Sequence, residues 1–340
     1  MMKTLRVWSV GLAAGALLLG SSWDAGATFS SVYVFGDSLS DNGNLYRASG
    51  GLLPPPAYGY YAGRASNGPV AVEQMASQLV PGGSSGIHFF DYAYAGAYSG
   101  TGNVWNYGTS AFPGLLEQVG SYATAFHNLQ TGYPLDPTLQ MLFPGGVAID
   151  PNALYVVWAG SNDFNSGIPN VTTAVGNIVQ AVQTLTGLGV MNILVPNLPN
   201  IGLTPRAQAQ GAFVVGLLTQ ASMGFNALLQ GQLTALDQSL AATIYQYDVF
   251  GLMQDVFANP LAHGFQSNGS YLLTCSGPTP PAACGNPNNY VFFDDLHPTA
   301  LAHSLIGDGL AQAVPLPAAF GLFAAALGLL GLGARRRSVA

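Results

Sequence analysis

The segment Val32-Tyr33-Val34-Phe35-Gly36-Asp37-Ser38-Leu39 joins an apolar run to a polar turn that continues as Ser40-Asp41-Asn42-Gly43-Asn44. β-Branched and aromatic residues favour strands, whereas Gly, Asp, Asn and Ser favour turns. The pattern predicts a buried strand over residues 32–35 with Ser38 just beyond its carboxyl end. Ligands of open parallel sheets bind at that end of the strands, so Ser38 is a candidate nucleophile. For Ser38 read alone, a turn-stabilising serine is the alternative.

The partners that such a serine needs lie near the other end of the chain. Asp294-Asp295-Leu296-His297-Pro298 follows the extended run Tyr290 to Phe293, and Asp294 can reach the His297 imidazole within one turn. A serine hydroxyl becomes a good nucleophile when a histidine accepts its proton and a carboxylate orients that histidine. Ser38, His297 and Asp294 are therefore predicted to act together. Read singly, His297 is a loop or capping residue and Asp294 a solvated acid.

Acyl transfer also requires hydrogen-bond donors for the developing oxyanion, and two further segments supply them. The strand-like run 153–159 leads into Gly160-Ser161-Asn162-Asp163, and the run 87–95 leads into Gly96. An Asn side chain and a Gly backbone N–H are suitable donors, each worth about 3–4 kcal/mol of barrier. A turn role for Asn162 and a close-packing role for Gly96 are the alternatives.

Apolar runs alternate with helix-like segments along the chain. This alternation predicts an α/β protein with a parallel sheet covered by helices on both faces. The expected strands are 32–35, 88–94, 154–158, 193–196 and 243–247. The expected helices are 69–79, 115–129, 171–185, 207–236 and 298–313.

Four blocks in this order resemble those of the GDSL, or SGNH, esterases and lipases. They are residues 36–44, Gly96, residues 160–163 and Asp294-Asp295-Leu296-His297-Pro298-Thr299. Smaller pieces at 63–69, 197–199 and 225–226 add to a similarity that covers nearly all of residues 29–312.

The resemblance implies a three-layer α/β/α sandwich whose mainly parallel, five-stranded sheet has the flavodoxin-like order 2-1-3-4-5. It implies Ser38 as nucleophile and first oxyanion donor, Gly96 and Asn162 as the other donors, and His297 as the base oriented by Asp294. No cofactor and no metal are implied. The chain departs from the family pattern where Ala95 precedes Gly96 in place of a second glycine, and where Phe293 replaces a common Trp.

The first 27 residues read as a secretory signal peptide. Lys3 and Arg6 precede an apolar run from Val10 to Gly20, and Ala25-Gly26-Ala27 forms a small-residue cleavage site. A core helix is the alternative. The sequence thus predicts export and one hydrolase domain over residues 28–313.

The chain contains few charged residues, and its net charge is negative. The 340 residues carry 8 Lys and Arg against 15 Asp and Glu, a net charge of −7. Residues 28–313 keep three arginines and fourteen acids, hence a net charge of −11. So acidic a protein is a poor partner for nucleic acid.

Only two cysteines occur, Cys275 and Cys284, in a Pro- and Gly-rich stretch shortly before Asp294. In an exported protein this pair predicts a disulfide, worth roughly 2–3 kcal/mol on the chain-entropy account. A zinc site that also uses His263 or His297 is the alternative, although further ligands are lacking.

Residues 314–340 form a separate tail. Val314-Pro315-Leu316-Pro317-Ala318 precedes an apolar stretch to Ala334 and then Arg335-Arg336-Arg337, which is long enough to span a bilayer with its charges cytoplasmic. The tail resembles PEP-CTERM sorting signals of the VPLPA type. That resemblance implies processing by an exosortase at the inner membrane of a Gram-negative bacterium and delivery to the cell surface. A plain single-span anchor is the alternative.

These features predict an exported serine esterase or lipase that acts on a small-molecule or lipid ester. Two other functions stay open: an O-deacetylase of extracellular polysaccharide, and a catalytically silent matrix or carbohydrate-binding protein that uses its Tyr-rich loops.

Overall fold

The computed structural model describes residues 29–106, 112–131, 149–166, 170–275 and 285–314. Its centre is a parallel sheet in the order β2-β1-β3-β4-β5. The strands are β1 (Val32–Gly36), β2 (Phe89–Asp91), β3 (Leu154–Trp158), β4 (Asn192–Pro196) and β5 (Thr243–Tyr247). The predicted α/β class and the strand order 2-1-3-4-5 are confirmed.

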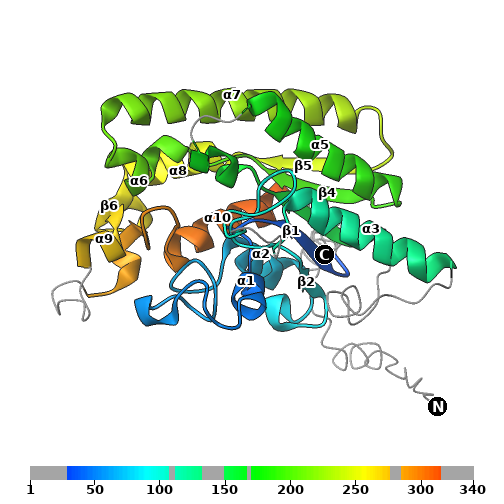
Figure 1. The fold of residues 1–340 in the computed structure, drawn as a ribbon, viewed down its shortest axis with the longest axis horizontal. Coiled ribbons are helices and arrows are strands. Elements are labelled where there is room, and N and C mark those ends of the chain that lie inside the picture. Colours follow the sequence, from blue (N-terminus) through cyan, green and yellow to red (C-terminus); the bar gives the residue numbers. More distant parts are fainter. Residues whose placement is uncertain (1–28, 107–111, 132–148, 167–169, 276–284, 315–340) are drawn as a thin grey trace, which may run out of the picture.

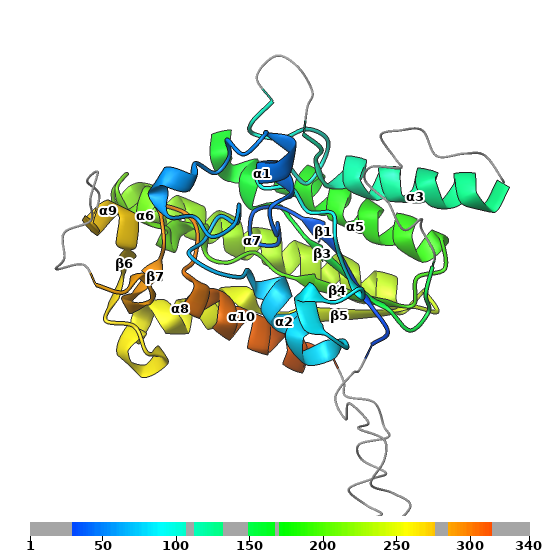
Figure 2. The same ribbon diagram turned by 90° about the horizontal axis from the view of Figure 1, so that it is seen from below.

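Helices cover both faces of this sheet, as Figures 1 and 2 show. Apolar side chains of α3 (Leu115–Thr131), α5 (Val171–Gly187) and α7 (Ala212–Asp237) pack on one face. Those of α2 (Ala71–Leu79), α8 (Val249–Ala258) and α10 (Ala300–Ala313) pack on the other. Successive residues of β1 and β3 feed the two clusters alternately, because side chains of a strand point to opposite faces.

Two expected elements differ in the structure. The helix expected over 207–236 is two helices, α6 (Pro205–Gln208) and α7. Gly211, with a φ of 91°, precedes α7 as its N-cap and interrupts the helical path between the two. The strand expected over 88–94 stops at Asp91. There the Asp91 carboxylate accepts the Ala93 N–H at 2.9 Å, and beyond it the N–H groups of Tyr92 and Tyr94 still donate to the Val34 and Gly36 carbonyls of β1.

A second, smaller sheet lies beside the main one and carries the carboxyl-terminal part of the site. It pairs β6 (Ser267–Ser270) with β7 (Tyr290–Phe292), and two short helices, α1 (Asn44–Ala48) and α9 (Tyr271–Cys275), complete the described α-helices. The predicted signal peptide 1–27, the tail beyond Val314 and Cys284 lie outside the described residues.

Candidate active site

Three strand ends converge at one edge of the sheet. Ser38 follows β1, Gly96 lies in the turn region after β2, and Asn162 sits in a short 3₁₀ segment, Ser161–Ser166, that follows β3. β1 lies between β2 and β3, and Gly36 pairs with Trp158 at this edge. The parallel topology therefore brings together blocks that are far apart in sequence.

The turn that presents Ser38 is fixed by its neighbours. The Asp37 carbonyl accepts the N–H groups of Ser40 at 3.0 Å and Asp41 at 2.9 Å. The Gln118 amide of α3 makes two 2.9 Å hydrogen bonds with the Gly36 backbone, one to its N–H and one to its carbonyl. Because both sides of the turn are held, the Ser38 side chain has a defined direction.

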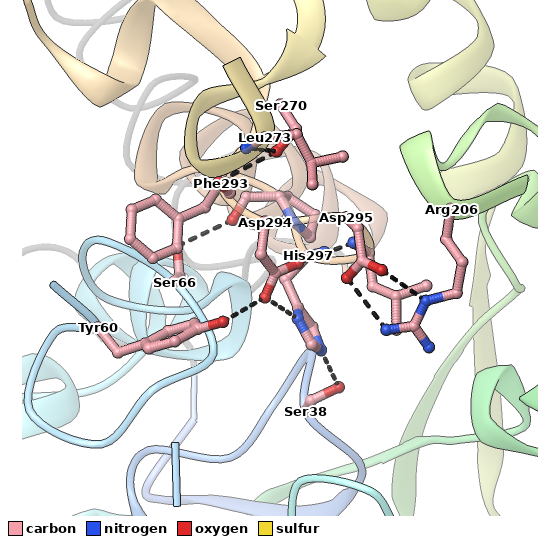
Figure 3. A network of polar contacts seen from close by, with 12 residues as sticks. Ser38, Tyr60, Ser66, Arg206, Ser270, Leu273, Phe293, Asp294, Asp295 and His297 are labelled. Carbon is pink, nitrogen blue, oxygen red and sulfur yellow. Dashed lines mark hydrogen bonds and ion pairs between the residues drawn. The ribbon is translucent and has the colours of Figure 1, made fainter. Parts of the chain in front are cut away.

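Ser38, His297 and Asp294 form one continuous chain of hydrogen bonds (Figure 3). Ser38 Oγ lies 2.9 Å from His297 Nε2, and His297 Nδ1 lies 2.7 Å from Asp294 Oδ2. Asp294 Oδ1 accepts the backbone N–H groups of Leu296 at 2.8 Å and His297 at 2.6 Å. The structure thus brings together the three residues that sequence analysis paired across the chain.

The electrostatics of this pair favour a charged carboxylate beside a basic imidazole. Burial disfavours the Asp294 carboxylate, but the adjacent His297 charge and the N–H donors outweigh burial and lower its pKa to about 2. Burial opposes the charged form of His297 as well, yet Asp294 more than compensates and raises the pKa of His297 above its usual range. His297 is therefore a stronger base than an isolated histidine.

Tyr60 is a site residue that sequence analysis missed. Its hydroxyl donates to Asp294 Oδ2 at 2.8 Å, the same oxygen that faces His297 Nδ1 (Figure 3). Its ring packs edge-on against Phe293 at 5.2 Å between centroids. Burial and the Asp294 charge raise the pKa of Tyr60, so its hydroxyl stays protonated and donates. No local pattern marked Tyr60, which belongs to a Tyr-rich loop 234 residues from Asp294.

The turn that carries Asp294 and His297 is braced from several sides. The Phe293 N–H donates to the His297 carbonyl at 2.7 Å and closes the turn. From α6, the Arg206 guanidinium donates to the Asp295 carboxylate through two nitrogens, at 2.7 and 3.0 Å. The backbone N–H of Arg206 also donates to the Asp295 carbonyl, at 2.9 Å. From α9, Leu272 donates its N–H to the Phe293 carbonyl at 2.8 Å. Sequence analysis assigned no role to Arg206 or to Asp295.

Gly96 is held in place by the turn that follows Ser38. Asp41 accepts the N–H of Gly43 at 2.7 Å and that of Ala95 at 2.7 Å, so one carboxylate ties the first block to the second. The Ala97 N–H donates to Tyr94. Among the described residues, the N–H groups of Ser38 and Gly96 meet no protein acceptor.

Gly96 also has to be glycine. Its φ is 85°, and a Cβ there would lie 2.5 Å from Asn103 Oδ1 and 2.6 Å from Val104 Cγ2. The alanine before it is harmless, because Ala95 has an ordinary conformation and its N–H is bound to Asp41. The Gly96 N–H, rather than that of either neighbour, is the donor left for a ligand in this turn.

Asn162 is positioned by the same loop. Its Nδ2 donates to the Ala97 carbonyl at 3.1 Å. The next residue, Asp163, accepts the Ser99 N–H at 2.9 Å and the Ser99 hydroxyl at 2.8 Å. These bonds join the turn after β3 to the loop after Gly96, so the two candidate donors are fixed relative to each other.

A cavity of about 410 Å³ opens beside these groups. Ser38, Asn162 and His297 line it together with residues of α6, α7 and α8. A volume of this size suits a small organic ligand.

The predicted disulfide stays a prediction, because Cys284 lies outside the described residues. Cys275 is buried at the end of α9, with its Sγ 3.8 Å from the Tyr290 hydroxyl. In the described part of the chain, no cluster of three or more His, Cys, Asp or Glu side chains is arranged to hold a metal ion.

Comparison with known proteins identifies the family. The GDSL-like Lipase/Acylhydrolase family matches residues 32–310. The chain is 26% identical to a phosphatidylcholine-sterol acyltransferase of Aeromonas hydrophila, over 89% of this chain and 96% of that protein. It is 28% identical to a GDSL esterase/lipase of Arabidopsis thaliana, over 89% and 92% of the two chains.

Among solved structures, a member of the lipolytic protein G-D-S-L family from Veillonella parvula aligns with a TM-score of 0.40 at 13% identity, over 84% of this chain and 95% of that one. The family match covers most of the chain, including every block that surrounds Ser38. The protein therefore belongs to the GDSL-like lipase/acylhydrolase family of carboxylic ester hydrolases.

Proposed function

We propose that the protein hydrolyses carboxylic esters through nucleophilic attack by Ser38. The observation that carries this proposal is the unbroken path from Ser38 Oγ through His297 to Asp294, with steps of 2.9 and 2.7 Å. Both steps lie within the range of good hydrogen bonds, so the hydroxyl proton has a direct acceptor.

In the first half-reaction, Ser38 Oγ bonds to the ester carbonyl carbon as its proton passes to His297 Nε2. The carbonyl oxygen becomes an oxyanion, which the N–H groups of Ser38 and Gly96 and the Asn162 amide stabilise. His297 then gives the proton to the leaving alcohol. In the second half-reaction His297 takes a proton from water, whose oxygen attacks the acyl-enzyme and releases the acid and free Ser38.

Asp294 keeps its negative charge throughout this cycle. It holds the imidazole with Nδ1–H toward the carboxylate and so leaves Nε2 free to accept the serine proton. The low pKa of Asp294 and the raised pKa of His297 support this division of roles.

We also infer from the sequence that the enzyme is exported, with residues 1–27 removed as a signal peptide. The VPLPA segment, apolar run and terminal arginines favour a tail that an exosortase-type enzyme removes. Mass spectrometry of both ends of the cell-surface protein tests this inference, and an intact carboxyl terminus would favour a permanent anchor.

Replacing Ser38 tests the proposal directly. Ser38→Ala removes the attacking oxygen, so turnover of p-nitrophenyl butyrate is expected to fall by at least about a thousandfold while the fold persists. Ser77→Ala serves as the control, because Ser77 is exposed on α2 and bonds only within its own helix. Wild-type turnover by a folded Ser38→Ala protein would refute both the triad and the proposed activity.

The oxyanion role of Asn162 predicts a loss in kcat. Asn162→Ala is expected to lower kcat about a hundred- to a thousandfold, because the donor acts mainly on the transition state. The measurement is a full saturation curve with circular dichroism to verify folding. An effect confined to KM would instead make Asn162 a ground-state binding residue.

The hydrogen bond from Tyr60 to Asp294 leads us to expect that replacing Tyr60 changes the pH dependence of kcat/KM. Only neutral His297 can accept the serine proton, so kcat/KM rises with pH through the raised pKa of His297, with a midpoint above the ordinary value of about 6.5. Tyr60→Phe removes one donor from Asp294 Oδ2 and concentrates negative charge toward the imidazole. We expect the midpoint to move up by roughly half to one pH unit and kcat to fall severalfold.

Tyr58→Phe is the matched control, because Tyr58 lies in the same loop and is 62% exposed. A merely structural role for Tyr60 would lower activity equally at every pH. An unchanged midpoint in Tyr60→Phe would therefore contradict the role of its hydroxyl on Asp294.

A further inference from the structure

We propose that the cavity beside Ser38 binds the aliphatic acyl chain of the substrate and that α7 sets the length of chain it accepts. The preferred substrates are then esters of medium- to long-chain fatty acids rather than acetyl esters. This inference rests on the proposed ester hydrolysis and names the substrate class of the same site.

The floor of the cavity is apolar and deeply buried. Trp158 of β3, Met253 of α8, Phe292 of β7 and Ile306 of α10 line it, and each is at most 4% exposed. Sixteen of the twenty-four described residues around the cavity are apolar. The cavity thus leads from the reacting groups into the hydrophobic interior between the sheet and its helices.

The outer wall is the first turns of α7. Val214, Leu217 and Leu218 line the cavity and are spaced three and four residues apart, so they share one face of the helix. Leu217 is 40% exposed, which places it where the wall meets solvent. From Ala212 to Leu236 the helix carries no charged residue.

Apart from the reacting groups and Ser161, whose buried Oγ meets no partner among the described residues, the polar side chains in the wall are engaged with the protein. Arg206 is paired with Asp295. Asn200 Oδ1 accepts from the Gly202 N–H and the Thr219 hydroxyl, both at 3.0 Å. Thr204 Oγ1 donates to the Ile201 carbonyl at 2.8 Å. A sugar needs several free polar partners, whereas a hydrocarbon chain needs only apolar surface, so this wall favours a hydrocarbon.

Size leads to the same conclusion. A cavity of about 410 Å³ is far larger than an acetyl group requires. Since burial of one methylene is worth about 0.8 kcal/mol, each added methylene is expected to raise kcat/KM by up to roughly three- to fourfold until the cavity is full. An acetyl ester has no further methylene groups to bury, so its kcat/KM does not gain from the rest of the cavity.

The first test is a series of p-nitrophenyl esters from acetate through butyrate, hexanoate and octanoate to decanoate, each below its solubility limit. We expect kcat/KM to rise along the series to at least octanoate. Highest kcat/KM on acetate, or a flat series, would overturn the acyl-chain assignment while leaving ester hydrolysis by Ser38 intact.

The second test narrows the cavity from α7. Leu218→Trp places a larger ring in the wall, so the ratio of kcat/KM on octanoate to that on acetate is expected to fall at least about tenfold. Gln220→Trp is the matched control, because Gln220 is exposed on the same helix and does not line the cavity. An equal ratio in the two variants would show that α7 does not limit chain length.

A binding measurement separates this inference from the proposed reaction. Ser38→Ala, which cannot be acylated, is titrated with a fluorescent fatty acid, alone and combined with Leu218→Trp. We expect saturable binding that weakens at least tenfold in the combined variant. Binding without hydrolysis by the wild type would refute the proposed function and keep the cavity assignment, and no saturable binding would refute the assignment.

Discussion

The carboxylate of Asp294 is the group on which the rest of the site depends, because both of its oxygens are used twice. Oδ1 accepts two backbone N–H groups, and Oδ2 accepts from His297 and from Tyr60. Burying a charge raises its free energy unless the charge is paired and hydrogen-bonded, and here four hydrogen-bond donors offset the loss of hydration. The same bonds fix the imidazole, so the stability of the carboxylate and the direction of His297 toward Ser38 have one cause.

Three further carboxylates, buried at Asp41 and partly buried at Asp91 and Asp163, do the equivalent work at the other side of the site. Asp41 accepts the N–H groups of Gly43, in the turn after Ser38, and of Ala95, just before Gly96. Asp163, next to Asn162, accepts the N–H and hydroxyl of Ser99 in the loop after Gly96. Asp91 accepts the Asn42 N–H at 2.8 Å and joins β2 to the same turn. Several of the acidic side chains of this chain therefore stabilise, by hydrogen bonds, the loops at the ends of β1, β2 and β3.

The strands were predictable because they are short runs rich in apolar, β-branched or aromatic residues that lead into Gly, Asp, Asn or Ser. In a parallel sheet, the carboxyl ends of neighbouring strands lie at the same edge. That logic found Ser38, Gly96 and Asn162, and the Asp294–His297 spacing found the other pair. It did not find Tyr60 or Arg206, because long-range side-chain hydrogen bonds leave no local pattern. The break at Gly211 was missed for a different reason: the residues on either side are good helix formers, and one positive φ decides the boundary.

The most direct measurement of the central claim is covalent labelling with a fluorophosphonate, followed by mass spectrometry of the peptide that contains residue 38. The account predicts one adduct, on Ser38 Oγ, which forms at a rate that rises with the neutral fraction of His297 and falls at least about a hundredfold in His297→Ala. An adduct on a different serine, or hydrolysis that continues while Ser38 stays unlabelled at saturating reagent, would contradict it.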